Sequence, residues 1–187
     1  GDLLDIKQAL SSPIRIDGEV IGIINIDSIK DSITFNNDDI KNMSYIKNEL
    51  ELSLKNFLSQ EKLKYIAVHD DLTGLYNRRS LKKLLEQELY KVRNSKAVSQ
   101  VALIDLDDFK IVNDTYGHQR GDQLIVRFSK LLKKYMGEES SCIRLSGDEF
   151  IVMLSNTSYE ETKNKIEGLS REACNLQEGE LPVYFSY

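Results

Sequence analysis

The sequence predicts an α/β protein with three parts: a β-rich segment, a long helix, and a larger part in which helices and strands alternate. Two strand-like runs flank the turn dipeptide Asp17-Gly18, residues 38–68 contain neither glycine nor proline, and apolar runs of strand length alternate with amphipathic helices from His69 onward. The 41% apolar content and 29% charged content are typical of a soluble globular protein. The formal net charge of −5 argues against a nucleic-acid polymer as a partner.

The first part predicts a β-hairpin. Residues 12–16 and 20–26 are rich in β-branched side chains, and Asp-Gly is a favoured two-residue turn between antiparallel strands. The polar residues 28–37 predict a loop, at the end of which Asn36 or Asn37 caps the next helix.

A helix is predicted over residues 38–68. Its apolar side chains recur at steps of three and four residues and form a stripe of Met43, Ile46, Leu50, Leu54 and Phe57. The stripe covers about two heptads, which is too short to distinguish a coiled-coil seam between two chains from packing against the chain's own domain. Both alternatives stay open.

The alternating part predicts further helices and strands. Helices are expected over residues 80–92, over residues 122–135, and from the capping box of Ser158 and Glu161 to about residue 177. Strands are expected over residues 98–106, 141–145, 150–154 and 182–187, with four residues between the second and third. The two cysteines, Cys142 and Cys174, are expected to be reduced and partly buried.

Carboxylates gather at two points of this part. The strand at 98–106 delivers Asp105 to its carboxyl end, followed by two further aspartates, and the turn between the next two strands carries Asp148 and Glu149 beside Gly147. Such residues are also explained as helix caps, solvated loop residues or a plain surface turn. If the hairpin pairs beside the strand of Asp105, three carboxylates converge, and oxygen ligands of this kind suit Mg²⁺ bound together with substrate phosphates. Because Gly147 has no Cβ, a phosphate can approach its backbone closely.

Three motifs in this part resemble those of the GGDEF family of diguanylate cyclases. Residues 144–150 read RLSGDEF, residues 70–79 read DDLTGLYNRR, and residues 105–122 read DLDDFKIVNDTYGHQRGD. They follow one another in the order and spacing of the family, and the resemblance covers about 120 residues, from Ile66 to the end. It implies a domain with a central, mostly antiparallel sheet flanked by helices. It also implies that the protein condenses two GTP molecules into cyclic di-GMP and two pyrophosphates with Mg²⁺, or with Mn²⁺ in its place.

The resemblance implies a role for each residue around the metal. Asp105 and Asp148, with the backbone carbonyl of Leu106, are expected to bind the ion. Asp148 is also the expected proton acceptor for the attacking 3′-hydroxyl, and Glu149 is expected to support the metal site. Lys110 is expected to neutralise charge on the triphosphate during transfer.

The resemblance also implies which residues recognise GTP. Asn113 and Asp122 are expected to read the guanine edge, because an amide offers a donor and an acceptor and a carboxylate accepts from the N–H groups of the base. His118, Phe109 and Gly147 complete the predicted GTP-binding residues. His118 is also explained as a loop histidine held by its neighbours, and Phe109, like Tyr116, is better explained as a packing residue.

Three departures from the family pattern lead to expectations of their own. Ser146 stands where the family has its first glycine, so its side chain is expected to crowd the phosphates or to require a strained φ, although activity is expected to survive. Residues 137–140 lack the Arg and the Asp of the family's product-inhibition motif, so we expect no noncompetitive inhibition by cyclic di-GMP. The chain stops before the basic residues that the family uses to anchor the triphosphate, so reduced activity is expected of this fragment.

The first two parts resemble the closing segment of a GAF sensor domain. Residues 13–22, reading PIRIDGEVIG, resemble the hairpin of that family, and the long helix resembles its exit helix. This resemblance implies a GAF-like fragment at 1–37, a signalling helix at 38–68, and a GGDEF domain at 69–187 that is truncated at its C-terminus.

The reaction and the sequence together lead to expectations about assembly and location. Each GTP attacks the other, so two domains must meet, and a homodimer through the 38–68 helix and the GGDEF domains is expected. No run is long and apolar enough to span a membrane, so this part is expected to be cytoplasmic and to make no membrane contact, while an anchor elsewhere in a longer parent protein stays open. Two rivals remain: a degenerate GGDEF module that binds GTP and regulates a partner, and another nucleotide cyclase with a palm-like fold.

Overall fold

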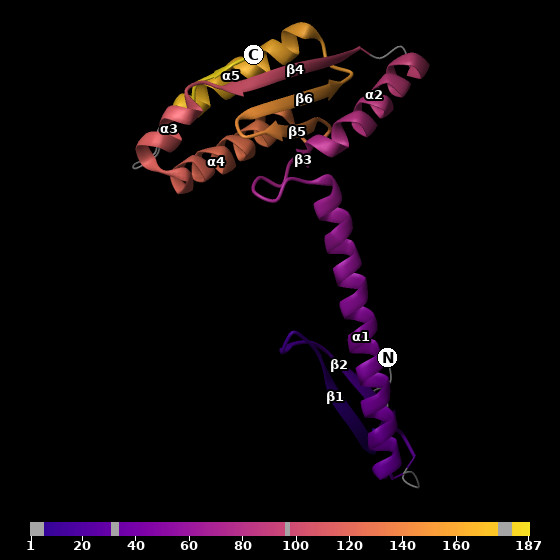
Figure 1. The fold of residues 1–187 in the computed structure, drawn as a ribbon. Helices are drawn as coiled ribbons and strands as arrows, with labels where there is room; N and C mark the ends of the chain where they lie inside the picture. The colour runs from indigo at the N-terminus through magenta and orange to yellow at the C-terminus, as the bar shows by residue number, and fades with distance from the viewer. Residues whose placement is uncertain (1–5, 31–33, 96–97, 176–180) are drawn as a thin grey trace. The chain divides into compact units, whose positions relative to one another are not determined.

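The computed structural model describes residues 6–30, 34–95, 98–175 and 181–187 (Figure 1). The chain divides into two compact units, residues 1–64 and residues 65–187, and each is described by itself. Within the described ranges, no helix is long and apolar enough to cross a membrane.

The N-terminal unit begins with the predicted hairpin. Strands β1 (Gln8–Ile16) and β2 (Glu19–Ser28) pair antiparallel, with a register irregularity at Ile14 and Arg15. Asp17 and Gly18 both have positive φ, at 49° and 91°, which is the backbone that a tight hairpin turn of this kind requires. The Asp-Gly signal is therefore confirmed, and the strands are longer than predicted.

Helix α1 (Asn37–Val68) agrees with the predicted helix to within one residue at its start. The carboxamide oxygen of Asn36 accepts from the backbone N–H groups of Asp38 and Asp39, at 2.7 and 3.2 Å, and the Asp39 carboxylate accepts from the Asn36 N–H at 2.8 Å. This reciprocal pair satisfies N–H groups that the first turn leaves without partners, so Asn36 rather than Asn37 is the cap.

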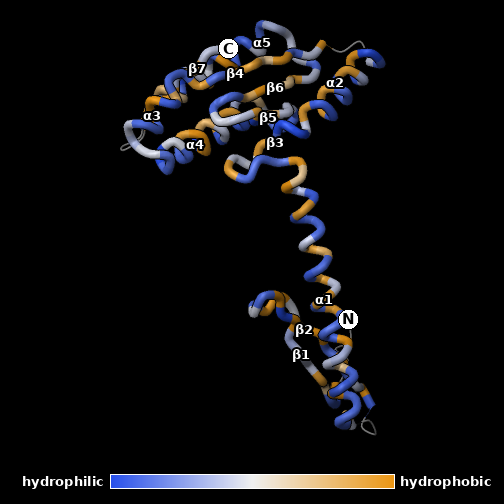
Figure 2. Tube along the Cα trace, viewed as in Figure 1, coloured by the Kyte–Doolittle hydropathy of each residue, from blue (hydrophilic) through white to orange (hydrophobic). Residues whose placement is uncertain are grey.

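Polar contacts join the hairpin to α1 within this unit. The backbone N–H of Arg15 donates to Glu51 at 2.6 Å, and Asp17 forms an ion pair with Lys55 at 2.8 Å. Met43 is buried, but Ile46, Leu50 and Phe57 remain 44%, 38% and 58% exposed. Figure 2 shows apolar residues recurring along the helix. Packing against the chain's own hairpin therefore accounts for only part of the predicted stripe.

The second unit contains a five-stranded sheet. Its strands are β3 (Tyr76–Asn77), β4 (Ser99–Leu106), β5 (Ser141–Ser146), β6 (Glu149–Ser155) and β7 (Phe185–Ser186), in the order β3-β5-β6-β4-β7. Every pairing is antiparallel except that of β3 with β5. The mostly antiparallel sheet implied by the resemblance is confirmed, and the strand predicted over 182–187 shortens to the two residues of β7.

Helices flank this sheet. After the 3₁₀ turn η1 (Arg78–Ser80) come α2 (Leu81–Ser95), α3 (Phe109–Tyr116), α4 (His118–Met136) and α5 (Tyr159–Cys174). The predicted helix at 122–135 begins four residues earlier, and α3 was not predicted because it is short and follows a run of aspartates. Gly117 separates α3 from α4 with a φ of 81°, a left-handed conformation that favours glycine. The capping box of Ser158 and Glu161 is confirmed, whereas the predicted helix end near residue 177 lies outside the described residues.

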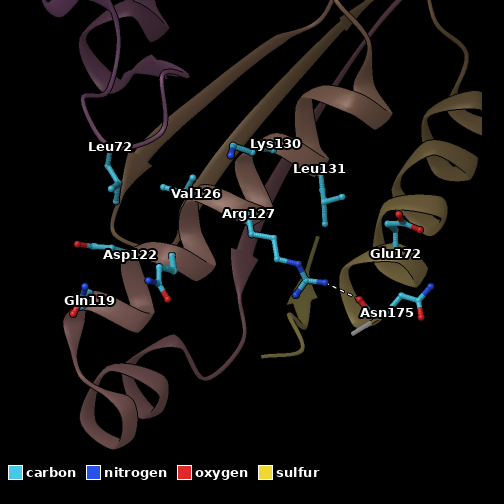
Figure 3. A pocket seen from close by; sticks show the side chains of 10 residues that line it. Leu72, Gln119, Asp122, Val126, Arg127, Lys130, Leu131, Glu172 and Asn175 are labelled. Carbon is cyan, nitrogen blue, oxygen red and sulfur yellow. Dashed lines mark hydrogen bonds between the residues drawn. The ribbon is translucent and has the colours of Figure 1, made fainter. Parts of the chain in front are cut away.

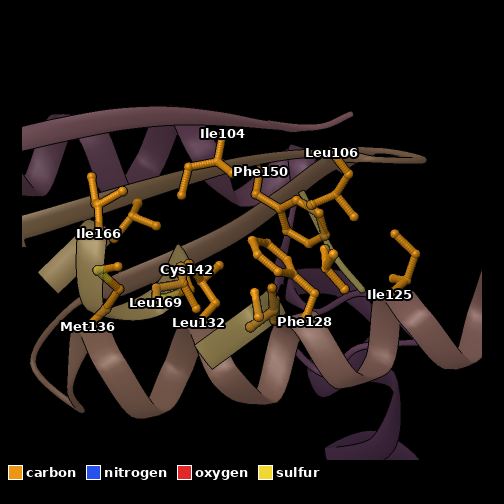
Figure 4. Packing of buried hydrophobic residues seen from close by; sticks show 14 of the residues in the cluster. Ile104, Leu106, Ile125, Phe128, Leu132, Met136, Cys142, Phe150, Ile166 and Leu169 are labelled. Carbon is orange, nitrogen blue, oxygen red and sulfur yellow. The ribbon is translucent and has the colours of Figure 1, made fainter. Parts of the chain in front are cut away.

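The core lies between one face of the sheet and helices α4 and α5 (Figure 4). Phe128 of α4 is fully buried, with its ring 5.1 Å from that of Phe150 and 5.4 Å from that of Phe185. On α2, outside this core, Leu85 and Leu89 are 39% and 45% exposed. Both cysteines are free thiols, and Cys142 is buried in this core.

Candidate active site

Carboxylates from two strands meet at one end of the sheet. In the antiparallel register of β4 and β6, Asp105 lies directly opposite Glu149. The turn that joins β5 to β6 carries Asp148, whose backbone carbonyl accepts from the N–H of Leu106 at 3.2 Å. The hairpin thus pairs beside the strand of Asp105, the arrangement on which the predicted convergence of three carboxylates depended.

The electrostatics of this end favour a bound cation. Burial raises the pKa of Asp105, and the negative charges of Asp148, Glu149 and Asp107 raise it further. Like charges directly opposite each other on paired strands are destabilising, and a cation relieves that repulsion. Oxygen-only donors of this kind fit Mg²⁺, which takes one or two carboxylates and completes its shell with phosphates and water.

The protein's own share of such a site is small. Among the described residues, no group of three or more His, Cys, Asp or Glu side chains is arranged to hold a metal ion. The predicted convergence of three carboxylates on one metal site is therefore not found among these residues. The set that the resemblance implies, Asp105, Asp148 and the Leu106 carbonyl, contains only two side chains. An ion held in this way depends on substrate oxygens for the rest of its coordination.

The turn of the acidic hairpin is tighter than predicted. β5 ends at Ser146 and β6 begins at Glu149, which leaves two residues in the turn instead of four. The prediction of a strained φ at Ser146 is wrong. The described non-glycine residues with positive φ are Asp17, Asp108 and Asn156, and Ser146 is not among them. The Ser146 hydroxyl donates to Glu149 at 2.6 Å, and a Cβ on Gly147 would meet nothing within 4 Å. The space beside Gly147 is open, as a close approach by a phosphate requires.

The two aspartates that follow β4 have different surroundings from Asp105. Asp107 accepts from the Ser186 hydroxyl at 2.7 Å, and its N–H donates to the Tyr184 carbonyl at 2.9 Å. Asp108 adopts the left-handed conformation, at φ 55°, and its carbonyl begins α3. Asp107 therefore forms two hydrogen bonds with the segment that contains β7, and the backbone of Asp108 redirects the chain into α3.

A network that the sequence did not predict reaches the same turn. Nη1 of Arg144 lies 3.1 Å from Asp70, while Nε and Nη2 donate to the Gly147 carbonyl at 3.0 and 2.8 Å. Asp70 also accepts from the N–H and the hydroxyl of Thr73. Burial raises the pKa of Asp70, but the bonds from Thr73 and Arg144 outweigh it and hold that pKa below its usual value. Arg144 thus ties the turn of the hairpin to the segment that follows α1.

The same segment closes the end of α1. The Asn77 carboxamide donates to the carbonyls of Ile66, Ala67 and His69, and the Ser80 hydroxyl donates to that of Val68 at 2.7 Å. These bonds satisfy carbonyls that a helix terminus leaves without partners. The motif at 70–79 therefore acts as a helix stop and as the anchor of Arg144, which its resemblance alone did not explain.

The predicted base-reading residues lie on the two consecutive helices α3 and α4. Asn113 of α3 is half-buried and contacts Gly121 of α4, and Asp122 is the next residue. Asp122 lines a pocket of about 710 Å³ together with Leu72, Gln119 and Val126 (Figure 3). Leu72 was missed, because nothing in the sequence distinguishes it from other apolar loop residues.

The remaining predicted residues are placed less specifically. His118 and Lys110 are exposed, and neither is among the residues that line the pocket of Asp122. Phe109 is half-buried and packs against the core, which supports its packing role.

Comparisons with known proteins agree with this geometry. Residues 67–181 match the family described as "Diguanylate cyclase, GGDEF domain". A diguanylate cyclase of Vibrio cholerae is 30% identical over 160 residues, which are 84% of this chain and 43% of the relative. The cyclic di-GMP phosphodiesterase PdeR of Escherichia coli is 40% identical over 131 residues, which are 68% of this chain and 19% of the relative. The chain spans less than half the length of these curated relatives.

Solved structures share the fold. The coiled coil and GGDEF domain of DgcB from Caulobacter crescentus, in complex with c-di-GMP, matches with a TM-score of 0.66 at 20% identity, covering 77% of this chain and 79% of that one. The diguanylate cyclase SiaD from Pseudomonas aeruginosa, in complex with its activator SiaC, matches with a TM-score of 0.58 at 28% identity, covering 80% and 58%. Because the family match spans more than half of the chain and includes both acidic segments, the chain belongs to the GGDEF family of diguanylate cyclase domains.

Proposed function

We propose that this protein is an active diguanylate cyclase that condenses two GTP molecules into cyclic di-GMP and two pyrophosphates. The observation that carries the proposal is the placement of Asp105 opposite Glu149, with Asp148 in the adjoining turn. A Mg²⁺-dependent nucleotidyl transfer needs one or two carboxylates beside the substrate phosphates, and Asp105 and Asp148 are the two proposed here. Burial and then the neighbouring negative charges raise the pKa of Asp105, and both effects support a bound cation rather than a structural role.

Each residue has a defined part in this proposal. Asp105, Asp148 and the Leu106 carbonyl hold Mg²⁺, or Mn²⁺, which polarises the phosphoryl group when it is bound. Asp148 accepts the proton of the 3′-hydroxyl, and Glu149, which accepts a hydrogen bond from Ser146, supports the metal site. Lys110 neutralises charge on the triphosphate. Asn113 and Asp122 read guanine, with His118 and Gly147 beside the nucleotide.

The reaction consumes only the two GTP molecules, and each step forms one P–O bond and breaks another. The 3′-oxygen of one GTP attacks the α-phosphorus of the other, the new P–O bond forms, and the bond to the leaving pyrophosphate breaks. The hydroxyl proton passes to Asp148. A second, equivalent step closes the ring, so two domains, each with one GTP, must face each other.

The proposed assembly is a homodimer through α1 and the GGDEF domains. Support comes from the stripe residues that the N-terminal unit leaves exposed, namely Ile46, Leu50 and Phe57. A second copy of the helix can cover them and raise the effective concentration of the two domains. The GAF-like identity of residues 1–37 and the regulation by a sensor stay predictions, as does a cytoplasmic location, where GTP is available.

A second candidate is a GGDEF module that binds GTP without converting it. The relation to PdeR favours this candidate, because that relative is a phosphodiesterase, and so does Ser146 in place of a glycine. Incubation of the purified protein with GTP and Mg²⁺, followed by identification of the product by mass, separates the two. Cyclic di-GMP supports the cyclase, whereas saturable GTP binding without product supports the module. The absence of both binding and product contradicts both candidates.

A further inference from the structure

Gly121 occupies a position where glycine has a cost and no backbone reason. It is buried in α4, near the start of the helix, and it is not among the described glycines with positive φ. Any residue can adopt its backbone conformation, and alanine is the better helix former in the interior of a helix. The reason for glycine must therefore be space.

The space is occupied by Asn113. A Cβ added to Gly121 would lie 2.0 Å from Oδ1 and 3.0 Å from Cγ of Asn113, and 3.3 Å from Cζ of Phe109. The first two distances are shorter than van der Waals contact allows, so the carboxamide of Asn113 rests directly against the backbone of α4. Among the described residues this carboxamide forms no side-chain hydrogen bond, so the packing of Oδ1 against Gly121 positions it and its NH₂ group has no partner there.

We infer that Gly121 is a positioning residue that sets the preference of the site for guanine. Its missing Cβ lets the Asn113 carboxamide lie against the backbone of α4 at the residue before Asp122. Asp122 lines the pocket of Figure 3 and Asn113 does not, so the inferred guanine lies at the rim of that pocket, between the two groups. This inference rests on the proposed function, in which these two residues read the base. When the amide is displaced, polar groups of guanine lose their hydrogen-bond partners. Affinity for adenine falls less, because Asn113 and Asp122 do not fit the polar groups of adenine.

The test compares Gly121→Ala with Asn113→Ala and with the double variant. We expect each single variant to weaken GTP binding by roughly tenfold, a loss on the scale of one hydrogen bond to a base, while ATP affinity changes much less. In the Asn113→Ala background the added methyl no longer meets the amide, and its remaining contact, 3.3 Å from Cζ of Phe109, needs only a small shift. Gly121→Ala should then change GTP affinity by less than about twofold. Binding of GTP and ATP is measured by calorimetry, and folding by thermal unfolding.

Gly168→Ala is the matched control. Gly168 is also a helical glycine, in α5, and a Cβ there would lie 2.8 Å from Cε1 of Tyr135. This variant carries a smaller clash between α4 and α5, at two residues that do not line the pocket of Asp122 and do not contact Asn113, so its GTP-to-ATP preference should equal that of the unmodified protein. If Gly121→Ala alone does not fold, the double variant should fold, because it removes the clashing amide. A double variant that is also unfolded overturns the inference.

The outcomes separate this inference from the proposed function. If Asn113→Ala leaves base preference unchanged, guanine reading by Asn113 fails and the inference fails with it. If Asn113→Ala relaxes the preference but Gly121→Ala binds GTP normally, only the positioning role is overturned. If Gly121→Ala weakens GTP binding as much in the Asn113→Ala background as it does alone, the inference is also overturned, because the methyl then acts through another contact.

Discussion

The two units of the chain differ in how much of their apolar side-chain surface is buried. In residues 65–187, apolar residues from the sheet, α4 and α5 form one core, in which Ile104, Phe128 and Phe150 have no exposed surface. In the described part of residues 1–64, Met43 is the one buried apolar side chain, while Ile21 and Ile23 of the hairpin are more than half exposed. The C-terminal unit thus positions its site with its own contacts, whereas the N-terminal unit presents apolar surface for another surface to cover.

The difference follows from the kinds of contact that each unit can make. A five-stranded sheet with two helices on one face encloses side chains from all sides. A two-stranded sheet beside a single helix encloses few, and a hairpin of this size is only marginally stable alone. We therefore expect changes in the C-terminal unit to affect chemistry and stability, and changes on α1 to affect assembly.

The largest expected effect is that of Asp105→Asn or Asp148→Asn, either of which should abolish cyclic di-GMP synthesis. Removal of one of two carboxylates should cost most of the affinity for Mg²⁺, with the fold intact. Because the pKa of Asp105 is raised, the fold disfavours the charged carboxylate at neutral pH. The free energy of unfolding therefore increases as the pH falls through that raised pKa. Asp105→Asn without metal should therefore be at least as stable as the unmodified protein. Product mass and thermal unfolding with and without Mg²⁺ are the measurements, and near-normal turnover in either variant contradicts the metal assignment.

The next effect concerns α1. Replacing Leu50 and Leu54 with Glu places charge on the stripe, so we expect a dimer to become a monomer and synthesis per chain to fall at low protein concentration, while GTP binding persists. The matched control is Leu52→Glu with Leu63→Glu, which adds the same charge to exposed leucines on the opposite side of the helix. Light scattering beside the activity assay decides the outcome. A Leu50/Leu54 variant that stays dimeric and fully active shows that the stripe is not the dimer contact.

A smaller effect is expected from Arg144→Gln. This change removes bonds from a cation to Asp70 and to the Gly147 carbonyl, so the free energy of unfolding should fall by about 1.5–3 kcal/mol and synthesis should fall with it. Because the pKa of Asp70 is lowered in the fold, this stabilisation is present above the ordinary aspartate pKa and is lost as the pH falls through the folded value. Denaturant unfolding at several pH values should show the two proteins converging in acid. Arg79→Gln, at an exposed arginine of η1, is the control, and an equal loss there contradicts a specific role for Arg144.

The smallest effect is expected from Glu88→Gln, at the opposite end of the sheet from the carboxylates. Glu88 is buried on α2 and accepts from Ser99, Ser155 and Lys91. Burial raises its pKa, but these bonds outweigh burial and lower it, so its stabilisation is lost as the pH falls through the folded pKa. We expect a loss of about 1 kcal/mol near neutral pH and unchanged synthesis. Glu86→Gln, at an exposed residue of the same helix, should change stability by less than about 0.5 kcal/mol. Loss of activity in Glu88→Gln would link the two ends of the sheet.

Local signals in the sequence were sufficient for the elements that local physics determines. The Asp17-Gly18 turn, the uninterrupted helix α1 and the capping box of Ser158 and Glu161 each depend on residues within a few positions of one another, and each was confirmed. The pairing of the acidic hairpin beside Asp105 was stated from the residues only as a condition, and the structure shows that the two strands do pair.

Contacts between distant residues were decided only by the tertiary structure. The start of α4 at His118 and the separate helix α3 depend on the left-handed backbone of Gly117, which the sequence pattern did not reveal. The bond from Arg144 to Asp70 joins residues 74 positions apart, and the contact of Asn113 with Gly121 requires two helices to meet at one glycine. Periodicity and turn propensity report the preferences of short segments, whereas these contacts exist only after the core has brought the segments together.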